Sequence, residues 1–192
     1  MRIVAGEWRG RKLIAPKGDA TRPTADRMRE TLFSMLTSRL GNLEELLVAD
    51  LFAGSGAIGL EALSRGARHC LFVEQERDAL DAIRANVNTL DARARSTIEA
   101  GSVMGLRPAR EPYDLILLDP PYRTGAGEVA LDRLLRLDWI NEATWIVLET
   151  AFDEEPKIRG LAIETTRKIG KGRLTFFRSE PAPAPRSDKA PD

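Results

Sequence analysis

The chain has 192 residues, and its 29 basic and 29 acidic side chains give a formal net charge of zero. This length predicts a single domain with a substantial core, and hydrophobic and charged fractions of 43% and 30% are typical of a soluble globular protein. The sequence has no apolar run of membrane-spanning length and no apolar leader of the secretory kind, which favours a cytoplasmic location. It has one cysteine, Cys70, so an internal disulfide is excluded, and a metal site is not expected.

The charges are unevenly distributed, because the first 29 residues are strongly basic. They contain eight basic and three acidic side chains, which gives +5 for this segment and leaves −5 for the rest of the chain. This asymmetry predicts a basic arm that binds RNA, with Trp8 stacking on unpaired bases, although a merely solvated charged face is the alternative. The RNA-binding candidates are Arg2, Trp8, Arg9, Arg11, Lys12, Arg22 and Arg27.

Residues 2–14 predict a short β-hairpin outside the core, so that its deletion is expected to spare the fold. A helix is expected from Thr24, which can cap its N-terminus, to about Leu40, with Gly41 at its C-terminus. Apolar residues from Met28 onward recur on one face of this helix, which predicts that it packs against the rest of the protein.

A glycine-rich turn follows the apolar run at residues 46–48 and leads into a predicted helix. Its sequence, Asp50 to Gly59, contains the spacing G-x-G-x-x-G in the strand–turn–helix context that this motif requires. Glycines allow the backbone to approach a ligand closely at a helix N-terminus. A second apolar strand ends at Glu74, whose carboxylate is placed to accept hydrogen bonds from ribose hydroxyls. The pattern predicts a nucleoside cofactor, either a dinucleotide or S-adenosylmethionine, and the candidate binding residues are Asp50, Phe52, Gly54, Ser55, Gly56 and Glu74.

The tetrad Asp119-Pro120-Pro121-Tyr122 follows the apolar run at residues 113–118. In an open α/β sheet, ligands bind at the carboxyl ends of the strands, where this tetrad is expected. Asp119 supplies acceptors, Pro120 has no N–H to compete with nearby carbonyls, and Tyr122 offers a ring for stacking. These properties suit a planar substrate with an exposed amino group, such as a nucleobase, whereas the simplest alternative is a proline-rich turn that ends a strand.

The remaining elements alternate between helix and strand before an antiparallel pair. Helices are expected at about 78–90 and 129–135, a strand at 145–149, and the antiparallel pair at 161–167 and 173–178. A second basic cluster lies in this pair, at Arg167, Lys168, Lys171, Arg173 and Arg178. Alternation of this kind predicts an α/β fold with a mostly parallel sheet. Residues 179–192 are rich in proline, alanine and charge and are expected to be disordered.

With both motifs in place, the chain resembles the bacterial small-subunit (16S) rRNA guanine-N2 methyltransferases of the RsmD type, over roughly residues 1–178. The specific part of the resemblance is Arg2–Leu13 and Arg22–Phe33, because the glycine turn is shared by all class I methyltransferases and the tetrad by other amino-group methyltransferases. The resemblance implies a Rossmann-like class I fold: a mostly parallel seven-stranded sheet with helices on both faces, a C-terminal antiparallel hairpin, and an N-terminal β-hairpin and helix extension. The expected divisions are an RNA-contacting extension at 1–41, a methyltransferase domain at 42–178 and a tail at 179–192.

The resemblance also implies that S-adenosylmethionine is the cofactor and that the enzyme acts as a monomer. The implied substrate is the N2 amine of a guanine in 16S rRNA, either free or in an assembly intermediate of the small subunit. Asp119 and the Pro120 carbonyl are then expected to accept the amine hydrogens, while Tyr122 stacks on an unpaired or flipped base. The catalytic candidates are Asp119, Pro120, Pro121 and Tyr122. Related enzymes often have an acidic residue near the adenine, where Ser102 is the expected cofactor contact in this chain.

Three other functions fit part of the pattern. A methyltransferase acting on adenine-N6 in DNA or on protein glutamine shares the tetrad, although such enzymes more often carry asparagine at its first position. An NAD-dependent oxidoreductase shares the glycine turn, but it needs a substrate domain or further catalytic residues that the sequence does not reveal. A non-catalytic RNA-binding protein on the same fold has no need for both the cofactor turn and the tetrad.

Overall fold

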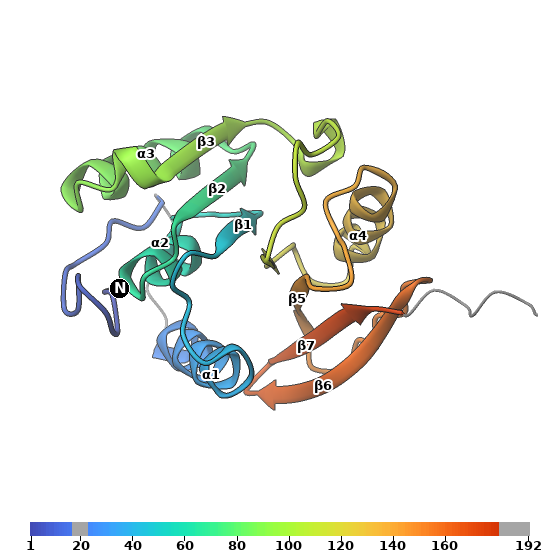
Figure 1. Cartoon of the computed structure of the whole chain (residues 1–192). Coiled ribbons are helices and arrows are strands. Elements are labelled where there is room, and N and C mark those ends of the chain that lie inside the picture. The colour runs from blue at the N-terminus through green and yellow to red at the C-terminus, as the bar shows by residue number, and fades with distance from the viewer. Residues whose placement is uncertain (17–22, 181–192) are drawn as a thin grey trace, which may run out of the picture.

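The computed structural model describes residues 1–16 and 23–180, so Arg22 and nearly all of the expected tail lie outside the described residues. Seven strands form one sheet in the order β3-β2-β1-β4-β5-β7-β6 (Figure 1). The strands are β1 Leu47–Leu51, β2 His69–Glu74, β3 Ser96–Ala100, β4 Leu115–Leu118, β5 Trp145–Ala151, β6 Leu161–Ile169 and β7 Gly172–Ser179. Strands β1 to β5 are parallel, and β7 pairs antiparallel with β5 and β6, which confirms the expected sheet and its C-terminal hairpin.

Helices cover both faces of the sheet, as expected (Figure 1). They are α1 Pro23–Leu40, α2 Ala57–Ser64, α3 Arg77–Thr89 and α4 Ala126–Arg136, with short 3₁₀ helices η1 Arg93–Arg95 and η2 Val103–Gly105. Side chains of α1, α2 and α3, such as Phe33, Leu60 and Ile83, form a core with one face of the sheet. Side chains of α4, including Leu131 and Leu134, form a second core with the other face.

Strand β4 positions the tetrad. It lies between β1 and β5 in the middle of the sheet, and all four of its residues, Leu115–Leu118, are buried. A strand that is covered on both faces needs an apolar residue at every position, which explains the unbroken apolar run in the sequence. Because β1, β2, β4 and β5 are parallel, their carboxyl ends meet at one edge of the sheet, and the residues that follow them come together there.

The N-terminal segment, residues 1–14, folds back on itself as an antiparallel hairpin, as expected, without forming regular strands. Arg2 and Lys12 form an isolated antiparallel bridge, and the backbone N–H groups of Ile3 and Leu13 donate to the carbonyls of Arg11 and Met1 at 3.0 and 3.1 Å. Ile3 is completely buried and Leu13 is 6% exposed, and both belong to the core that α1 and α2 form with the sheet. The expectation that this segment lies outside the core is therefore wrong, because two of its apolar side chains belong to that core.

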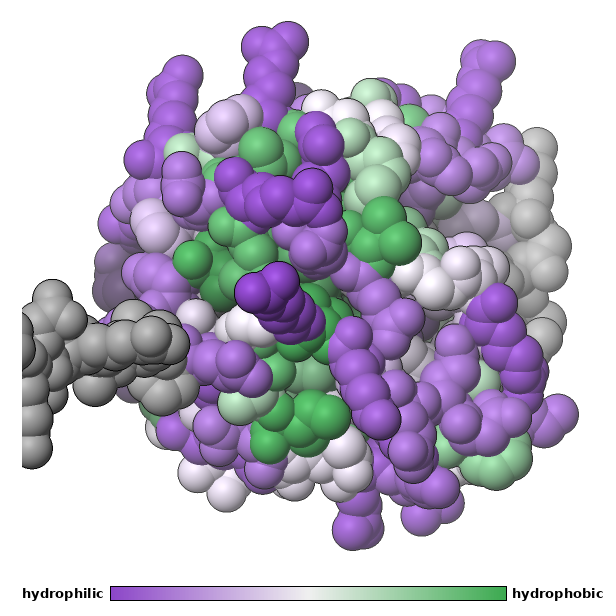
Figure 2. Space-filling view, turned by 90° about the vertical axis from the view of Figure 1, so that its right-hand side faces the viewer, coloured by the Kyte–Doolittle hydropathy of each residue, from purple (hydrophilic) through white to green (hydrophobic). Residues whose placement is uncertain are grey.

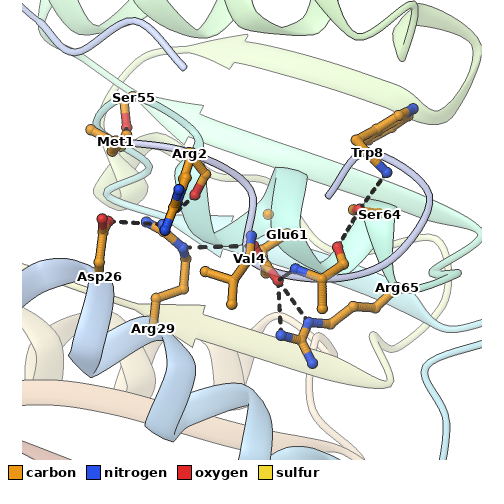
Figure 3. A network of polar contacts seen from close by, with 12 residues as sticks. Met1, Arg2, Val4, Trp8, Asp26, Arg29, Ser55, Glu61, Ser64 and Arg65 are labelled. Carbon is orange, nitrogen blue, oxygen red and sulfur yellow. Dashed lines mark hydrogen bonds and ion pairs between the residues drawn. The ribbon is translucent and has the colours of Figure 1, made fainter. Parts of the chain in front are cut away.

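Glu61 on α2 holds the N-terminal segment in place (Figure 3). Its carboxylate is completely buried and accepts hydrogen bonds from the backbone N–H groups of Val4 at 2.7 Å and Ala5 at 2.9 Å. The guanidinium groups of Arg65, at 2.8 Å, and of the buried Arg29, at 3.7 Å, balance its charge. The anchor depends on all of these partners, because an uncompensated charge in a protein core is strongly destabilising.

No helix in the described part of the chain is both long enough and apolar enough to cross a membrane. On the side of the molecule that carries α4 and the β6–β7 hairpin, hydrophilic side chains surround separate apolar patches (Figure 2). The exposed apolar side chains of these elements include Val129 and Ile163. Single apolar side chains of this kind are ordinary on a protein surface.

Candidate active site

A cavity of about 920 Å³ lies at the edge of the sheet where β1, β2, β4 and β5 end. A volume of this order is that of a pocket for a small organic ligand or cofactor. Among the predicted site residues, the cavity is lined by Phe52, Glu74, Ser102, Asp119, Pro120, Pro121 and Tyr122. Four further candidates, Asp50, Gly54, Ser55 and Gly56, do not line it and shape the adjoining glycine turn instead. The structure thus brings the tetrad and three of the seven cofactor candidates into one space, with the other four in the adjoining turn.

The glycine turn between β1 and α2 depends on close backbone packing. The buried Asp50 accepts a hydrogen bond from the N–H of Gly59 at 2.8 Å, and burial raises the pKa of Asp50 to about 7. Gly56 caps α2 with a φ of 75°, a left-handed conformation that favours glycine. At Gly59, an added Cβ would lie 2.4 Å from the ring of Phe72, so only glycine lets α2 pack this closely on β2.

Ser55 connects the glycine turn to the N-terminal segment. Its hydroxyl donates to Met1 Sδ at 3.4 Å, and its carbonyl accepts a hydrogen bond from the Asn86 side-chain amide at 2.9 Å. The same Asn86 side chain, on α3, donates to the Ile14 carbonyl at 2.9 Å and accepts from the Ile14 N–H at 2.7 Å. Both ends of the N-terminal segment are therefore attached to the turn or to its immediate support.

Glu74, the last residue of β2, has a carboxylate that is fixed by three backbone donors. Oε2 accepts from the N–H of Gly54 at 2.8 Å, while Oε1 accepts from Gln75 at 2.7 Å and from Glu76 at 2.9 Å. These bonds tie the glycine turn to β2 and hold the carboxylate at the cavity wall. Because a carboxylate has about four acceptor positions, Glu74 can still accept a hydrogen bond from a ligand hydroxyl.

Two further wall residues, Phe52 and Ser102, have unusual local roles. Phe52 has a φ of 62°, in the left-handed region that residues with a side chain rarely adopt, so the turn is strained where it meets the cavity. Ser102 caps η2 by accepting a hydrogen bond from the N–H of Met104 at 3.2 Å. Its hydroxyl proton remains available as a donor to a ligand in the cavity.

The tetrad leaves β4 at the cavity. The Asp119 N–H donates to the Leu51 carbonyl at 3.4 Å, which keeps the start of the tetrad beside the end of β1. Pro120 is buried, whereas Tyr122 is 39% exposed. The Tyr122 hydroxyl donates to Glu149 Oε1 at 2.6 Å. Burial and this hydrogen bond raise the pKa of Tyr122 well above its usual range, so its hydroxyl remains a donor.

Glu149 on β5 lines the same cavity, and sequence reasoning did not select it. Leu118 of β4 is paired in register with Leu148 of β5, so Asp119 and Glu149 follow at the same level on neighbouring chain segments. Burial raises the pKa of Glu149, and the hydrogen bond from Tyr122 offsets part of this shift. Part of the signal was available, because Glu149 follows the apolar run at residues 145–148, but its place beside Asp119 depends on the sheet order.

The predicted RNA-binding residues have different surroundings. Those with exposed side chains are Arg2, Arg9, Arg11, Lys12 and Arg27, while Arg22 lies outside the described residues. Arg11 nevertheless donates to the Thr89 carbonyl at 2.6 Å. The Arg95 guanidinium lies over the half-buried ring of Trp8, 4.9 Å from its centroid. Arg11 and Trp8 therefore both have partners within the protein.

Two basic segments lie at opposite ends of the parallel strands, one at the end away from the cavity and one at the end next to it. In the N-terminal turn, the Glu7 N–H donates to the carbonyl of Ser64, the last residue of α2, at 2.8 Å, and α2 runs away from the cavity. The turn between β6 and β7 lies at the cavity edge, because Gly172 pairs with Ala151 at the end of β5. An added Cβ at Gly172 would lie 3.0 Å from the Tyr122 hydroxyl. The basic residues next to this turn, Arg167, Lys168 and Lys171, therefore lie near the tetrad, whereas Arg178 lies over Trp145 at the start of β5.

The sheet order, the glycine turn, the acid that ends β2 and the Asp-Pro-Pro-Tyr turn at the same edge define a class I methyltransferase. The solved structure of yhhF from Escherichia coli has the same fold, with a TM-score of 0.82 and 32% identity over 94% of this chain and 98% of that one. The chain belongs to the family whose model is described as "Conserved hypothetical protein 95", which matches residues 1–178.

Two similar proteins carry the name Ribosomal RNA small subunit methyltransferase D. The protein from Escherichia coli (strain K12) is 37% identical over 150 residues, which cover 78% of this chain and 74% of that protein. The protein from Haemophilus influenzae is 37% identical over 158 residues, which cover 80% of each. The family resemblance inferred from the sequence is confirmed.

Proposed function

We propose that this protein transfers a methyl group from S-adenosylmethionine to the exocyclic N2 amine of a guanine in 16S rRNA. The observation that carries the proposal is that Glu74 and the tetrad Asp119–Tyr122 line one cavity. An acceptor for a ribose and an acceptor for an amine are thereby placed in the same space, as transfer between two bound reactants requires. The names of the two relatives support rRNA of the small subunit as the substrate.

The donors and acceptors of the cavity fit S-adenosylmethionine, which when bound supplies a methyl group activated by a positive sulfonium. Glu74, fixed by three N–H groups, accepts a hydrogen bond from the ribose. The backbone of the turn at Gly54 and Gly56 approaches the amino-acid end of the cofactor, and Ser102 contacts the adenine. Phe52 contributes apolar wall surface. The cavity volume of about 920 Å³ leaves room for a base beside the cofactor.

Asp119 and Pro120 prepare the amine for attack. The Asp119 carboxylate and the Pro120 carbonyl accept its two hydrogens, which turns the nitrogen lone pair out of the ring and toward the methyl group. As the carbon–nitrogen bond forms and the carbon–sulfur bond breaks, positive charge grows on the nitrogen. Asp119 stabilises this charge and receives the proton that the methylated amine releases. Tyr122, oriented by its bond to Glu149, stacks on the flipped base.

The rRNA backbone, on this proposal, contacts exposed basic residues in two places. The first set is Arg2, Arg9, Lys12 and Arg27, and the second, in the β6–β7 hairpin, is Arg167, Lys168 and Lys171. The second set adjoins Phe152, which is exposed and whose backbone N–H donates to the Lys171 carbonyl at 2.9 Å. Basic side chains next to an exposed aromatic ring suit a single strand that leaves a flipped base.

Mass spectrometry of the product tests this function. The purified protein is incubated with 16S rRNA and methyl-labelled S-adenosylmethionine, either as a naked transcript or in small subunits from a strain that lacks the gene. The expected product after digestion to nucleosides is N2-methylguanosine. Formation of N6-methyladenosine would assign the protein to adenine, and calorimetry that shows tighter binding of NAD than of S-adenosylhomocysteine would overturn the cofactor.

A further inference from the structure

Glu149 is a carboxylate in the proposed active site that the methyl transfer described above uses only to orient Tyr122. It is half-buried and lines the cavity together with Asp119. Leu118 and Leu148 are partners on neighbouring parallel strands, so the residues that follow them are separated by about one strand spacing, roughly 4.8 Å between backbones. The cavity wall therefore presents two acidic side chains next to each other.

Two adjacent acceptors match the Watson–Crick edge of guanine. On that edge the N2 amine and the neighbouring N1–H are both donors, and a flipped base is read through hydrogen bonds to this edge. Adenine has an acceptor at N1, which would place a lone pair against a carboxylate. If Asp119 holds the amine, the neighbouring acid is positioned for the next group along the edge, which in guanine is N1–H.

The bond to Tyr122 keeps Glu149 ready to accept such a donor. A length of 2.6 Å is that of a charge-assisted bond from a hydroxyl to an ionised carboxylate. This bond engages Oε1, and a carboxylate can accept several hydrogen bonds at once. Burial raises the pKa of Glu149, which means that the ionised group is poorly solvated and gains from a second donor.

We infer that Glu149 accepts the N1–H of the target base and so selects guanine, an inference that rests on the proposed function. Asp119 then accepts a hydrogen bond from the reacting amine, Glu149 accepts one from the adjacent ring N1–H, and Tyr122 both stacks on the base and orients Glu149. The inference assigns a residue of β5 to substrate choice, in addition to the motif residues that follow β1, β2 and β4.

Replacement of the base tests the inference after the methylated guanine has been mapped. Two oligoribonucleotides are made, with guanine or 2-aminopurine at that position; 2-aminopurine keeps the amine but has an acceptor at N1. The wild-type protein should prefer guanine in kcat/KM. Glu149→Gln can donate an N–H to N1, so it should act more slowly on guanine and faster on 2-aminopurine. The preference should fall at least about tenfold, the factor that one unpaired buried polar group commonly costs.

Three other variants separate substrate reading from a structural role. Glu149→Ala should lose the preference without gaining activity on 2-aminopurine. Tyr122→Phe removes the hydroxyl and keeps the ring, so if Glu149 only orients Tyr122, this variant and Glu149→Gln should slow both substrates equally. Glu155→Gln is the matched control, because Glu155 is exposed and does not line this cavity; its preference should equal that of the wild type.

The outcomes distinguish this inference from the proposed function. A wild-type protein that forms no N2-methylguanosine contradicts the proposed function itself. A wild-type protein that forms it, together with glutamine and alanine variants at Glu149 that keep the full preference for guanine, overturns only the role of Glu149. Calorimetry with S-adenosylhomocysteine verifies that each variant retains the cofactor site.

Discussion

Replacing Glu61 by alanine tests whether a buried carboxylate attaches the N-terminal segment to the body. The change removes the acceptor for the N–H groups of Val4 and Ala5, at 2.7 and 2.9 Å. It also removes the charge that balances Arg29, whose side chain is only 4% exposed, and Arg65 at 2.8 Å. Arg29 keeps a bond to Asp26, but its Nε, which faces Glu61, would have no acidic partner.

The expected loss in the free energy of unfolding is about 3–5 kcal/mol, the usual effect of removing one partner from a buried charge pair. This is a large part of the roughly 5–15 kcal/mol that stabilises a typical domain. Urea denaturation followed by circular dichroism measures the loss. Tryptophan fluorescence supplies a second probe, because Trp8 lies in the segment that Glu61 anchors.

The matched control is Asp132→Ala, which breaks an ion pair with Arg136 on the exposed surface of α4. Exposed pairs of this kind contribute less than about 1 kcal/mol. Glu61→Gln should fall between the two, since it keeps a hydrogen-bond acceptor and loses the charge. If Glu61→Ala is destabilised no more than Asp132→Ala, the carboxylate does not anchor the segment and the reasoning is refuted.

Three further predictions concern the chemistry, the RNA and the pH dependence. Asp119→Ala should reduce turnover more than tenfold, which corresponds to a rise of at least about 1.4 kcal/mol in the activation barrier. Its affinity for S-adenosylhomocysteine, measured by calorimetry, should be unchanged, and retention of more than a tenth of the turnover would contradict the role of Asp119. Glutamine at Arg167, Lys168 and Lys171 should weaken rRNA binding and flatten its salt dependence by roughly 0.7–0.9 in log–log slope for each phosphate that is no longer neutralised. The matched set is glutamine at Arg2, Arg9 and Lys12, which should weaken rRNA binding less. If this set weakens binding more than the set at Arg167, Lys168 and Lys171, the main RNA-binding surface lies on the N-terminal segment. Burial raises the pKa of Asp50 to about 7, so the folded protein keeps a proton that the unfolded chain releases above about pH 4, and stability should fall as the pH rises between these values. Asp50→Asn should reduce this fall and unfold at higher urea than the wild type at pH 8, and an unchanged slope in urea midpoint against pH would refute the assignment.

Local sequence patterns were sufficient to predict the elements that position the site. The apolar run that became β4 is buried at every residue, and the glycine spacing between residues 54 and 59 carries its own steric reason, as the close approach of Gly59 to Phe72 demonstrates. Features that depend on a few consecutive residues, such as an acid at the end of an apolar strand, could be located before the sheet order was known.

Features that depend on partners distant in sequence could not be predicted in this way. Glu61 reads as one charged residue in a short helix, and its burial becomes explicable only when Val4 and Ala5, more than 50 positions away, are found to donate to it. Glu149 lies beside Asp119 because β4 and β5 are neighbours in a particular register, which periodicity does not specify. The burial of the hairpin at residues 2–14 was missed for the same reason, since Ile3 and Leu13 pack on a core formed by α1, α2 and the sheet.

The attachment of the N-terminal segment determines how RNA binding has to be tested. Met1 and Ile14 contact Ser55 or the Asn86 side chain that supports it, so deletion of the segment would disturb the glycine turn as well as remove basic residues. A drop in methylation after such a deletion could not be attributed to RNA binding. Substitution of exposed charges leaves these supports intact, so the comparison of the two basic sets isolates the electrostatic contribution that salt dependence measures.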